Sequence, residues 1–598
     1  MASAMSLDPW FRGSRSSHSL RAAALSLLGV VAGCADVAPE AEGGGLQLQF
    51  AALTPSGCLT STAGRNSVPE TVATVAVAIR AGDAAPRIER IARTKLMSAG
   101  QWLVPNVKAG VPIDVEVWGC GADKSVGWAG RSNGLSVEAQ KESTTQVFLA
   151  PTAALGCTGS DAKSVTAGET DHLQTGRSLS AIAALAGGDA VVVGGIGSWS
   201  GKDRKGVASR DVDVFDHRVG AFYKGPQLQS SRVWHHAIAI GPQQVLVVGG
   251  VTQVQQIGAT NLPSPLLMPG KPDDAAPLAA AELIDLKVGN SRKVPVAAGA
   301  GLQLLSSAVA ALGGALFVGG VDGSGAATKV ATHVGDFAGI IGGGAGKATT
   351  LSLGAARARP GLVVLEGGGV LIVGGNLDGG SGQGFELLTE VAKGPVALAV
   401  AGDAALMQSK GLMTIGPIAV SLGVRNGAEA VLVMGGLGAS SITAEQSQTY
   451  LARVDVAAAK VTLVGVDIGG KALLGGFAGL GVAVPGGALV AAGAIKLTGG
   501  APCAGSAAEC IGADLWRVAL GADTGAGVGA QPLTLQVVDA LGGPRFGLVG
   551  VSVPGGTLLV GGQSTLVELG VEGAAALDPT GRLLARLPSD PALGALCP

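Results

Sequence analysis

Aromatic and charged residues are scarce in this chain of 598 residues. It contains 10 Phe, 7 Trp and 2 Tyr, and 14% of its residues are charged, against about 25% in an average soluble protein. The formal net charge is −2, which excludes the basic field that a nucleic-acid-binding protein uses. Apolar residues still make up 47% of the chain, which excludes a disordered polar tract.

Glycine, in contrast, is abundant, with 99 residues. These glycines follow no Gly-X-Y period, which excludes a collagen. The chain is too long for one ordinary domain, and it consists largely of short apolar segments separated by turns. We therefore expect a large all-β protein.

Long apolar helices are also lacking. The stretch 472–495 carries no charge, but Pro485 and two Gly-Gly pairs interrupt it. Two buried strands explain this pattern better than a membrane-spanning helix does.

The first 33 residues have the pattern of a signal peptide. Three arginines precede a short apolar run over 22–32, which ends in Val31-Ala32-Gly33-Cys34. These residues resemble the lipobox of bacterial lipoproteins, in which the cysteine is lipidated and the chain is cut before it. The alternative is an ordinary secretory signal with a chance cysteine.

The lipobox resemblance implies that Cys34 is the lipidated first residue of the mature chain. Residues 34–45 are small, acidic and Gly-rich, as expected of a flexible tether. Ala35 stands where an Asp is associated with inner-membrane retention, which favours the outer membrane. We therefore expect a lipid-anchored protein of the bacterial cell envelope.

Six further cysteines suit three disulfides in an exported protein. The preferred pairing joins Cys58 to Cys120, Cys503 to Cys510, and Cys157 to Cys597. The last bridge would fasten the two ends of a closed ring, and the alternative is that Cys597 is frayed or pairs elsewhere. No CxxC pair occurs and there are six histidines, so the spacing predicts no zinc site, and we expect no cofactor.

A repeat organises the chain from about residue 170 onward. An apolar run ending in Gly-Gly recurs about every 61 residues, a period that fits one four-stranded sheet per copy. The pairs stand at 194–195, 249–250, 319–320, 374–375, 435–436 and 561–562, with a degenerate copy at Ala492-Gly493. A second apolar run precedes each pair across a turn, and an alternating segment follows it, which predicts a hairpin and two outer strands.

These residues resemble the Kelch repeat. Arg232, His235 and Gly249-Gly250 match its order, and Arg177 and Arg357 also precede their first glycine by 17 residues. Three other copies lack the arginine at this offset, and in the last copy Arg545 comes one residue late, so no binding site is carried over from the family. The resemblance implies a seven-bladed β-propeller over 156–598.

A smaller domain precedes the propeller, over about 46–155. The segment 102–110 before an alternating strand at 111–118 resembles the Ig-like or prealbumin-like sandwiches of exported bacterial proteins. We therefore expect a small β-sandwich before the ring.

Residues that could carry catalysis are few. Some Kelch-type propellers are copper-radical oxidases, which need two axial tyrosines, but this chain has only Tyr223 and Tyr450, each expected on an outer strand. His235 and His236 are adjacent, so on a strand they point to opposite faces and cannot share a metal ion. We expect no catalytic residue and no metal ligand.

Loops between second and third strands offer the best binding candidates, because variable loops on a rigid ring commonly carry recognition. The loop 197–210 contains Trp199, Lys202, Asp203, Arg204 and Lys205. The loops 251–279 and 494–512 are also long. These features predict a non-enzymatic envelope protein that binds a protein or a glycan; the alternative is an exported carbohydrate-active enzyme of the epimerase or lyase type.

Overall fold

The computed structural model is built almost entirely of β-strands. It describes residues 43–52, 68–96, 100–158, 169–170, 173–200, 205–218, 220–256, 267–269, 281–295, 306–322, 326–375, 384–402, 416–436, 449–467, 479–491, 514–521, 531–540, 545, 547–562, 581–585 and 597. Within these ranges the helical elements are α1 (Phe337–Ile341) and a 3-10 turn, η1 (Arg93–Lys95). Among the described residues, no helix is both long and apolar enough to cross a membrane.

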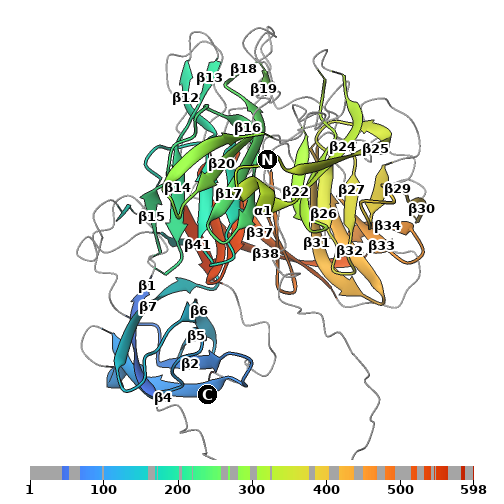
Figure 1. The fold of residues 1–598 in the computed structure, drawn as a ribbon. Coiled ribbons are helices and arrows are strands. Elements are labelled where there is room, and N and C mark those ends of the chain that lie inside the picture. The colour runs from blue at the N-terminus through green and yellow to red at the C-terminus, as the bar shows by residue number, and fades with distance from the viewer. Residues whose placement is uncertain are drawn as a thin grey trace, which may run out of the picture.

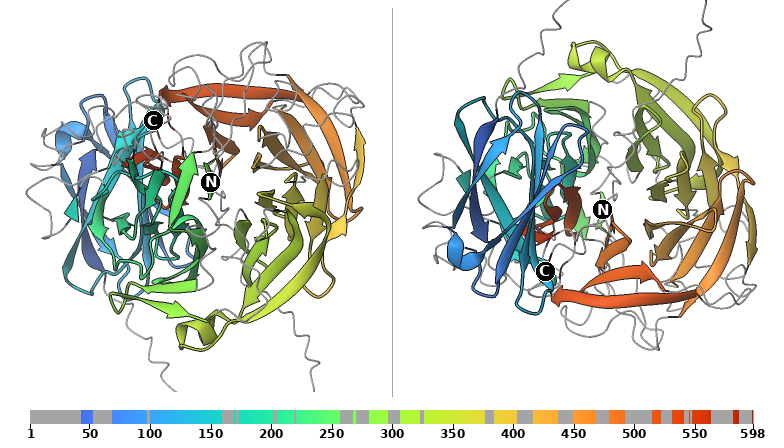
Figure 2. Two further views of the ribbon diagram at one scale, coloured as in Figure 1. Left: turned by 90° about the horizontal axis from the view of Figure 1, so that it is seen from above. Right: turned by 90° about the horizontal axis from the view of Figure 1, so that it is seen from below.

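Seven four-stranded antiparallel units form a β-propeller, as the sequence predicts (Figures 1 and 2). Blade 1 consists of β10 (Ala181–Ala184), β11 (Ala190–Val193), β14 (Val212–Asp216) and β15 (Ala221–Lys224). Blade 2 consists of β16 (Val233–Gly241), β17 (Gln244–Val251), β20 (Ala281–Asp285) and β21 (Asn290–Val294). Blade 3 consists of β22 (Ser307–Ala311), β23 (Gly314–Val318), β24 (Thr328–Gly335) and β25 (Lys347–Arg357). Blade 4 consists of β26 (Gly361–Val364), β27 (Val370–Val373), β28 (Phe385–Leu388) and β29 (Val396–Ala397). Blade 5 consists of β31 (Ile418–Arg425), β32 (Ala428–Met434), β33 (Tyr450–Asp455) and β34 (Lys460–Asp467). Blade 6 consists of β35 (Leu480–Val484), β36 (Gly487–Ala491), β37 (Asp514–Leu520) and β38 (Gln531–Ala540). Blade 7 consists of β39 (Val549–Val553), β40 (Gly556–Val560), β41 (Gly581–Ala585) and β8 (Gly156–Cys157). The first strands of the blades contact one another in cyclic order, so the ring is closed.

Two short strands extend the sheets of blades 1 and 5. Strand β9 (Glu169–Thr170) adds a fifth strand to blade 1, and β30 (Ala399–Gly402) pairs in parallel with β34 of blade 5. Strand β34 also pairs with β38, so the outer edges of blades 5 and 6 are joined.

The apolar strands are explained by the layers between blades. In β17, Val245 and Val247 pack toward blade 1, whereas Leu246 and Val248 pack toward blade 3. Similar layers lie between the other neighbouring blades. Because an inner strand is buried on both faces, its sequence is continuously apolar rather than alternating, and the low charge of the chain follows from this arrangement.

Three arginines fasten the blades to which they belong. Arg232 is 0% exposed, and its Nη2 lies 2.8 Å from Oε1 of Glu282 in β20, while Nη1 donates to the Gly249 carbonyl at 2.7 Å. Arg177 pairs with Asp213 and Arg357 pairs with Glu386 in the same way. The arginine of the repeat is therefore a structural group, held by an acid on the third strand.

In three of the Gly-Gly pairs, the second glycine joins neighbouring blades. The amide of Gly195 in blade 1 donates to the carbonyl of Arg232 in blade 2 at 2.8 Å. Equivalent bonds run from Gly320 to Arg357 at 2.7 Å and from Gly562 to Arg177 at 2.8 Å. The last of these bonds joins blade 7 to blade 1.

The N-terminal domain is one curled seven-stranded sheet, whose two halves enclose a core of their own. Its order is β3 (Arg87–Ala92), β2 (Thr74–Ala81), β5 (Ile113–Cys120), β6 (Val126–Leu135), β7 (Glu142–Pro151), β1 (Gly44–Ala52) and β4 (Gln101–Val107). The predicted sandwich thus takes the form of a single sheet folded over. The domain lies below blades 7 and 1, beside the ring axis (Figures 1 and 2), and it shares a hydrophobic cluster with both blades.

Ring closure differs from the prediction. Strand β8, which precedes the ring in sequence, pairs with β41 and supplies the outer strand of blade 7. A disulfide joins Cys597 to Cys120 of β5, so the predicted pairs Cys157–Cys597 and Cys58–Cys120 are wrong. The C-terminus is bonded to the N-terminal domain because that domain packs directly against blade 7.

The remaining cysteine predictions are only partly covered by the structure. Cys157 is disulfide-bonded. Cys34, Cys58, Cys503 and Cys510 lie outside the described residues.

Candidate functional site

Two of the long loops form a small sheet above one face of the propeller. Its strands are β12 (Ile196–Ser200) and β13 (Lys205–Ala208) from the blade 1 insertion, and β18 (Gln253–Gln256) and β19 (Leu267–Pro269) from the blade 2 insertion. Figure 1 shows this raised sheet at the end of the molecule opposite the N-terminal domain. Two insertions from adjacent blades therefore build one surface.

Part of the predicted binding set lies on the raised sheet. Trp199 of β12 pairs with Gly206 of β13, and Lys205 of β13 pairs with both Ser200 and Gln255. Lys202, Asp203, Arg204 and the loop 494–512 lie outside the described residues. The sequence indicated both loops but not their pairing.

A second feature lies on the inner side of the ring, and sequence reasoning missed it. The guanidinium carbon of Arg359, before β26 in blade 4, lies 3.1 Å from the ring centroid of Trp234 in blade 2. Blade 3 separates these two blades, so their side chains meet across its axial side. Arg359 is 2% exposed and Trp234 is 8% exposed, and burial lowers the pKa of the Arg359 guanidinium.

Two histidines of blade 2 lie next to this contact. His236 donates from Nε2 to the Ser306 carbonyl of blade 3 at 3.1 Å, whereas His235 donates from Nε2 to the Val193 carbonyl of blade 1 at 3.0 Å. They point to opposite neighbours, as predicted for adjacent residues of a strand. Trp234, His236, Ser306 and Arg359 are called the axial cluster below.

Both histidines are held neutral. Burial lowers the pKa of His235 to about 3, with the charge of Arg232 adding to the effect. Burial likewise lowers the pKa of His236 to about 4, and the charge of Arg359 contributes to this shift. At neutral pH these rings are hydrogen-bonding groups and weak bases.

The axial cluster and the raised sheet belong to the same face. In each blade the first strand begins, and the second strand ends, at the face from which the second-to-third loop leaves. Trp234 lies near the start of β16, and Arg359 lies two residues before β26. The turns between first and second strands, by the same alternation, lie at the opposite face.

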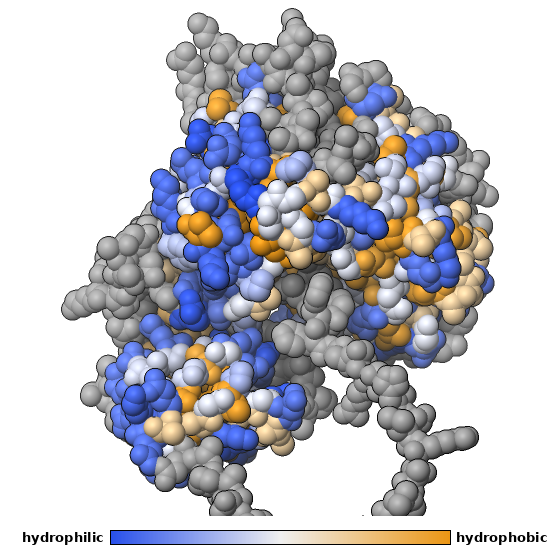
Figure 3. Space-filling view, in the orientation of Figure 1, coloured by the Kyte–Doolittle hydropathy of each residue, from blue (hydrophilic) through white to orange (hydrophobic). Residues whose placement is uncertain are grey.

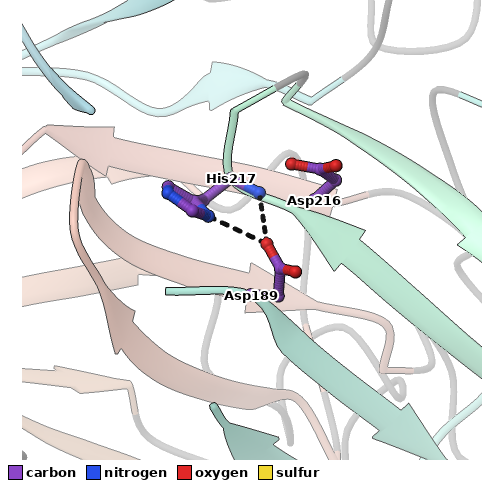
Figure 4. A group of neighbouring side chains, drawn as sticks. All are labelled: Asp189, Asp216 and His217. Carbon is purple, nitrogen blue, oxygen red and sulfur yellow. Dashed lines mark hydrogen bonds and ion pairs between the residues drawn. The ribbon is translucent and has the colours of Figure 1, made fainter. Parts of the chain in front are cut away.

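Asp189, Asp216 and His217 gather at that opposite face (Figure 4). Their potential ligand atoms all lie within 4.8 Å of one another. However, Nδ1 of His217 is 2.8 Å from Oδ1 of Asp189, and Arg218 pairs with Asp216 at 2.9 Å. Both carboxylates are thus already engaged by cationic or hydrogen-bonding partners, so the group fastens the two turns of blade 1 and is a poor metal site.

The tyrosines lie where the sequence placed them. Tyr223 is on β15, a fourth strand, and Tyr450 is on β33, a third strand. Tyr450 is 1% exposed and packs edge-on against Phe385 of the neighbouring blade. Neither tyrosine is on a first strand.

The described surface is unevenly polar. In Figure 3, hydrophilic residues dominate over blades 1 and 2, whereas apolar residues are more frequent over blades 3 to 5. Val207 of β13 is 48% exposed, so the raised sheet itself presents an apolar side chain to solvent.

Comparisons with known proteins leave the family open. No family model matches the chain, and no curated protein matches it. A solved structure titled "Structure of YjhT" is similar over 58% of this chain and 94% of its own, with 15% identity and a TM-score of 0.34. The assignment of a propeller accordingly depends on the sheet topology described above.

Proposed function

We propose that the chain is a lipid-anchored binding protein of the bacterial cell envelope, with a Kelch-type propeller that recognises a protein or a glycan. The observation that carries this proposal is the raised sheet, since insertions from two blades fold together over one face. Insertions that carry no function are not expected to form strand pairs with the insertion of the adjacent blade. The lipobox supplies the anchor at Cys34, and its Ala35 favours the outer membrane.

The binding proposal is tested by capture from envelope extracts. Replacing residues 197–208 by a short Gly-Ser linker removes β12 and β13, and Trp199→Ala removes one aromatic side chain from the same hairpin. We expect both variants to lose the captured partner. Val288→Ser is the matched control, because Val288 is 66% exposed in the β20–β21 turn at the opposite face. Equal capture by all variants would refute the proposed binding face.

The anchor is tested separately. Cys34→Ala removes the thiol that accepts the lipid, so we expect unprocessed precursor on a gel and no palmitate label. Normal processing in this variant would show that the lipobox interpretation is wrong.

An exported carbohydrate-active enzyme is the alternative, and the axial cluster is the observation that favours it. An ionisable arginine beside a histidine near a propeller axis could orient a sugar. Against catalysis there, His236 has its Nε2 committed to Ser306 and a pKa of about 4. Epimerase or lyase turnover that Arg359→Leu abolishes would reverse the ranking.

A further inference from the structure

One edge of the N-terminal domain is basic, although the whole chain carries a net charge of −2. Strand β3 and the turn η1 that follows it contain four cations and one acid, a net charge of +3. They are Arg87, Arg90, Arg93 and Lys95, with Glu89 as the acid, and are called the basic edge below. Arg87, Arg90 and Lys95 are exposed, and Ile88 among them is 38% exposed.

The protection of an edge strand does not explain this excess of one sign. Strand β3 is the last strand on one side of its sheet, and charged side chains on such a strand discourage pairing with another chain. Either sign serves that purpose, and a mixture of both signs keeps a surface soluble. Glu89 pairs with Arg87, and the other three charges of the basic edge are all positive. A positive edge therefore indicates a negative partner.

The basic edge lies where the tether enters the domain. An added Cβ at Gly43, the first described residue, would lie 3.0 Å from Cα of Asn106. Arg87 donates from Nη1 to the carbonyls of Asn106 and Pro105 at 3.0 and 2.9 Å. Gly43 follows Cys34 closely in the sequence, so even a fully extended tether spans about 30 Å at most. A lipid on Cys34 would therefore keep the basic edge close to a membrane surface.

An anionic membrane surface complements this edge. Phosphate headgroups attract clustered Lys and Arg side chains over about one Debye length, which is about 8 Å at physiological salt. A few cations attract a free protein only weakly, but a short tether raises the effective concentration of the two surfaces. Ile88 adds an apolar side chain of the kind that enters the headgroup region.

We infer that the basic edge docks on anionic phospholipid headgroups and thereby orients the anchored protein. This inference rests on the proposed function, because the lipid at Cys34 brings the membrane to the edge. The raised sheet is at the end of the molecule opposite the N-terminal domain (Figure 1). Docking through the N-terminal domain therefore directs the proposed binding face away from the membrane.

Vesicle binding is measured on the mature chain, residues 34–598, with Cys34→Ser so that no lipid contributes. Co-sedimentation with vesicles of phosphatidylcholine and phosphatidylglycerol in equal parts gives the partition coefficient. At about 0.1 M NaCl the Debye length is about 10 Å, so mainly charges at the contact count. We expect binding to these vesicles, at least a tenfold loss at about 1 M NaCl, and at least a tenfold loss on vesicles of phosphatidylcholine alone.

The double variant Arg90→Glu, Lys95→Glu tests the residues. Each cation near an anionic surface strengthens binding about fivefold, so we expect at least a tenfold loss. Arg87 and Arg93 are left unchanged, because each donates to a backbone carbonyl of the domain. The matched control is Lys293→Glu, Lys329→Glu, which makes the same change of charge at two exposed lysines of blades 2 and 3. It should bind at least fivefold more tightly than the edge variant.

The dependence on salt and on headgroup charge tests the inference on the unaltered edge, whatever the edge variant does to the fold. Thermal unfolding of the edge variant should give the Tm of the control. No vesicle binding, equal binding to both kinds of vesicle, binding retained at high salt, or equal losses in the two double variants would each overturn the inference. Binding of poly-glutamate without binding of vesicles would assign the edge to an acidic protein and would also overturn it.

Failure of the proposed function has a different signature. Partner capture and palmitate labelling use the raised sheet and Cys34, so both should persist in the edge variant. Absence of vesicle binding, with capture and labelling intact, would reject the docking inference alone. Absence of capture by the wild-type chain, with vesicle binding intact, would reject the proposed binding function instead.

Discussion

Arg232 illustrates how one residue stabilises a blade. Its guanidinium is fully buried with Glu282, so Arg232→Met leaves an uncompensated carboxylate in the ring. Breaking such a pair costs about 3–5 kcal/mol. We expect a fall of this size in the free energy of unfolding by urea, and recovery of much of it in the double variant Arg232→Met, Glu282→Leu. Arg218→Met, at a half-exposed pair, should cost less than about 1 kcal/mol; equal costs at both sites would contradict the structural role.

The two glycines of the pair Gly249-Gly250 are required for different reasons. Gly249 has a φ of +71° and open space around an added Cβ, so Gly249→Ala should cost about 1 kcal/mol from backbone strain alone. At Gly250 an added Cβ would lie 2.7 Å from the Val233 carbonyl oxygen, so Gly250→Ala should cost several-fold more. Thermal unfolding of the two variants measures the difference, and similar Tm values would show that close approach is not what Gly250 provides.

Neutral buried histidines predict a pH dependence of stability. The pKa values of His235 and His236 are about 3 and about 4 in the folded chain, below the unfolded value of about 6.5. The unfolded state therefore binds more protons between these limits, and the free energy of unfolding falls as the pH drops from 7 towards 4. The slope should be about 1 kcal/mol per pH unit for each histidine. Urea titrations at several pH values check it, and His236→Gln should reduce the slope; an unchanged slope would show that His236 titrates freely in the folded chain.

At the scale of elements, we expect the raised sheet to unfold without unfolding the ring. Val254 of β18 is 1% exposed, so Val254→Asp buries a carboxylate in the raised sheet. We expect hydrogen exchange to quicken over 196–208 and 253–256 while the first strands of the blades stay protected. Gln253→Asp, one residue away and partly exposed, is the control. Loss of protection throughout blades 1 and 2 would mean that the raised sheet supports the ring.

The repeat predicted the strands of the ring because its features are local. An apolar run, a turn and a Gly-Gly pair specify one hairpin, and the hairpins recur at a fixed period. The acids that pair with the arginines were harder to find, because loops of different length separate Asp213, Glu282 and Glu386 from their glycines. The contact of Trp234 with Arg359 joins residues 125 positions apart in blades that are not adjacent, and no local pattern encodes it.

For the whole molecule, the arithmetic of six cysteines allows 15 pairings, and spacing alone could not choose among them. The choice depends on where the N-terminal domain sits. Its Phe148 and Trp118 share a hydrophobic cluster with blades 7 and 1, and Cys597 packs against that cluster. The domain, the last blade and the C-terminus therefore form one unit.

The Cys120–Cys597 disulfide should accordingly stabilise the closing region of the ring. It spans 477 residues, for which the chain-entropy model gives roughly 6 kcal/mol as an upper limit. The double variant Cys120→Ser, Cys597→Ser avoids a stray thiol. We expect it to unfold at a lower temperature and to exchange amides faster over β39 and β40. Strand β23 of blade 3 and strand β27 of blade 4 lie two and three blades away from blade 1. Both should keep their protection, because the hydrophobic layers in which they pack contain no residue of the N-terminal domain. Uniform loss of protection around the ring would instead mean that the disulfide stabilises the propeller as one cooperative unit.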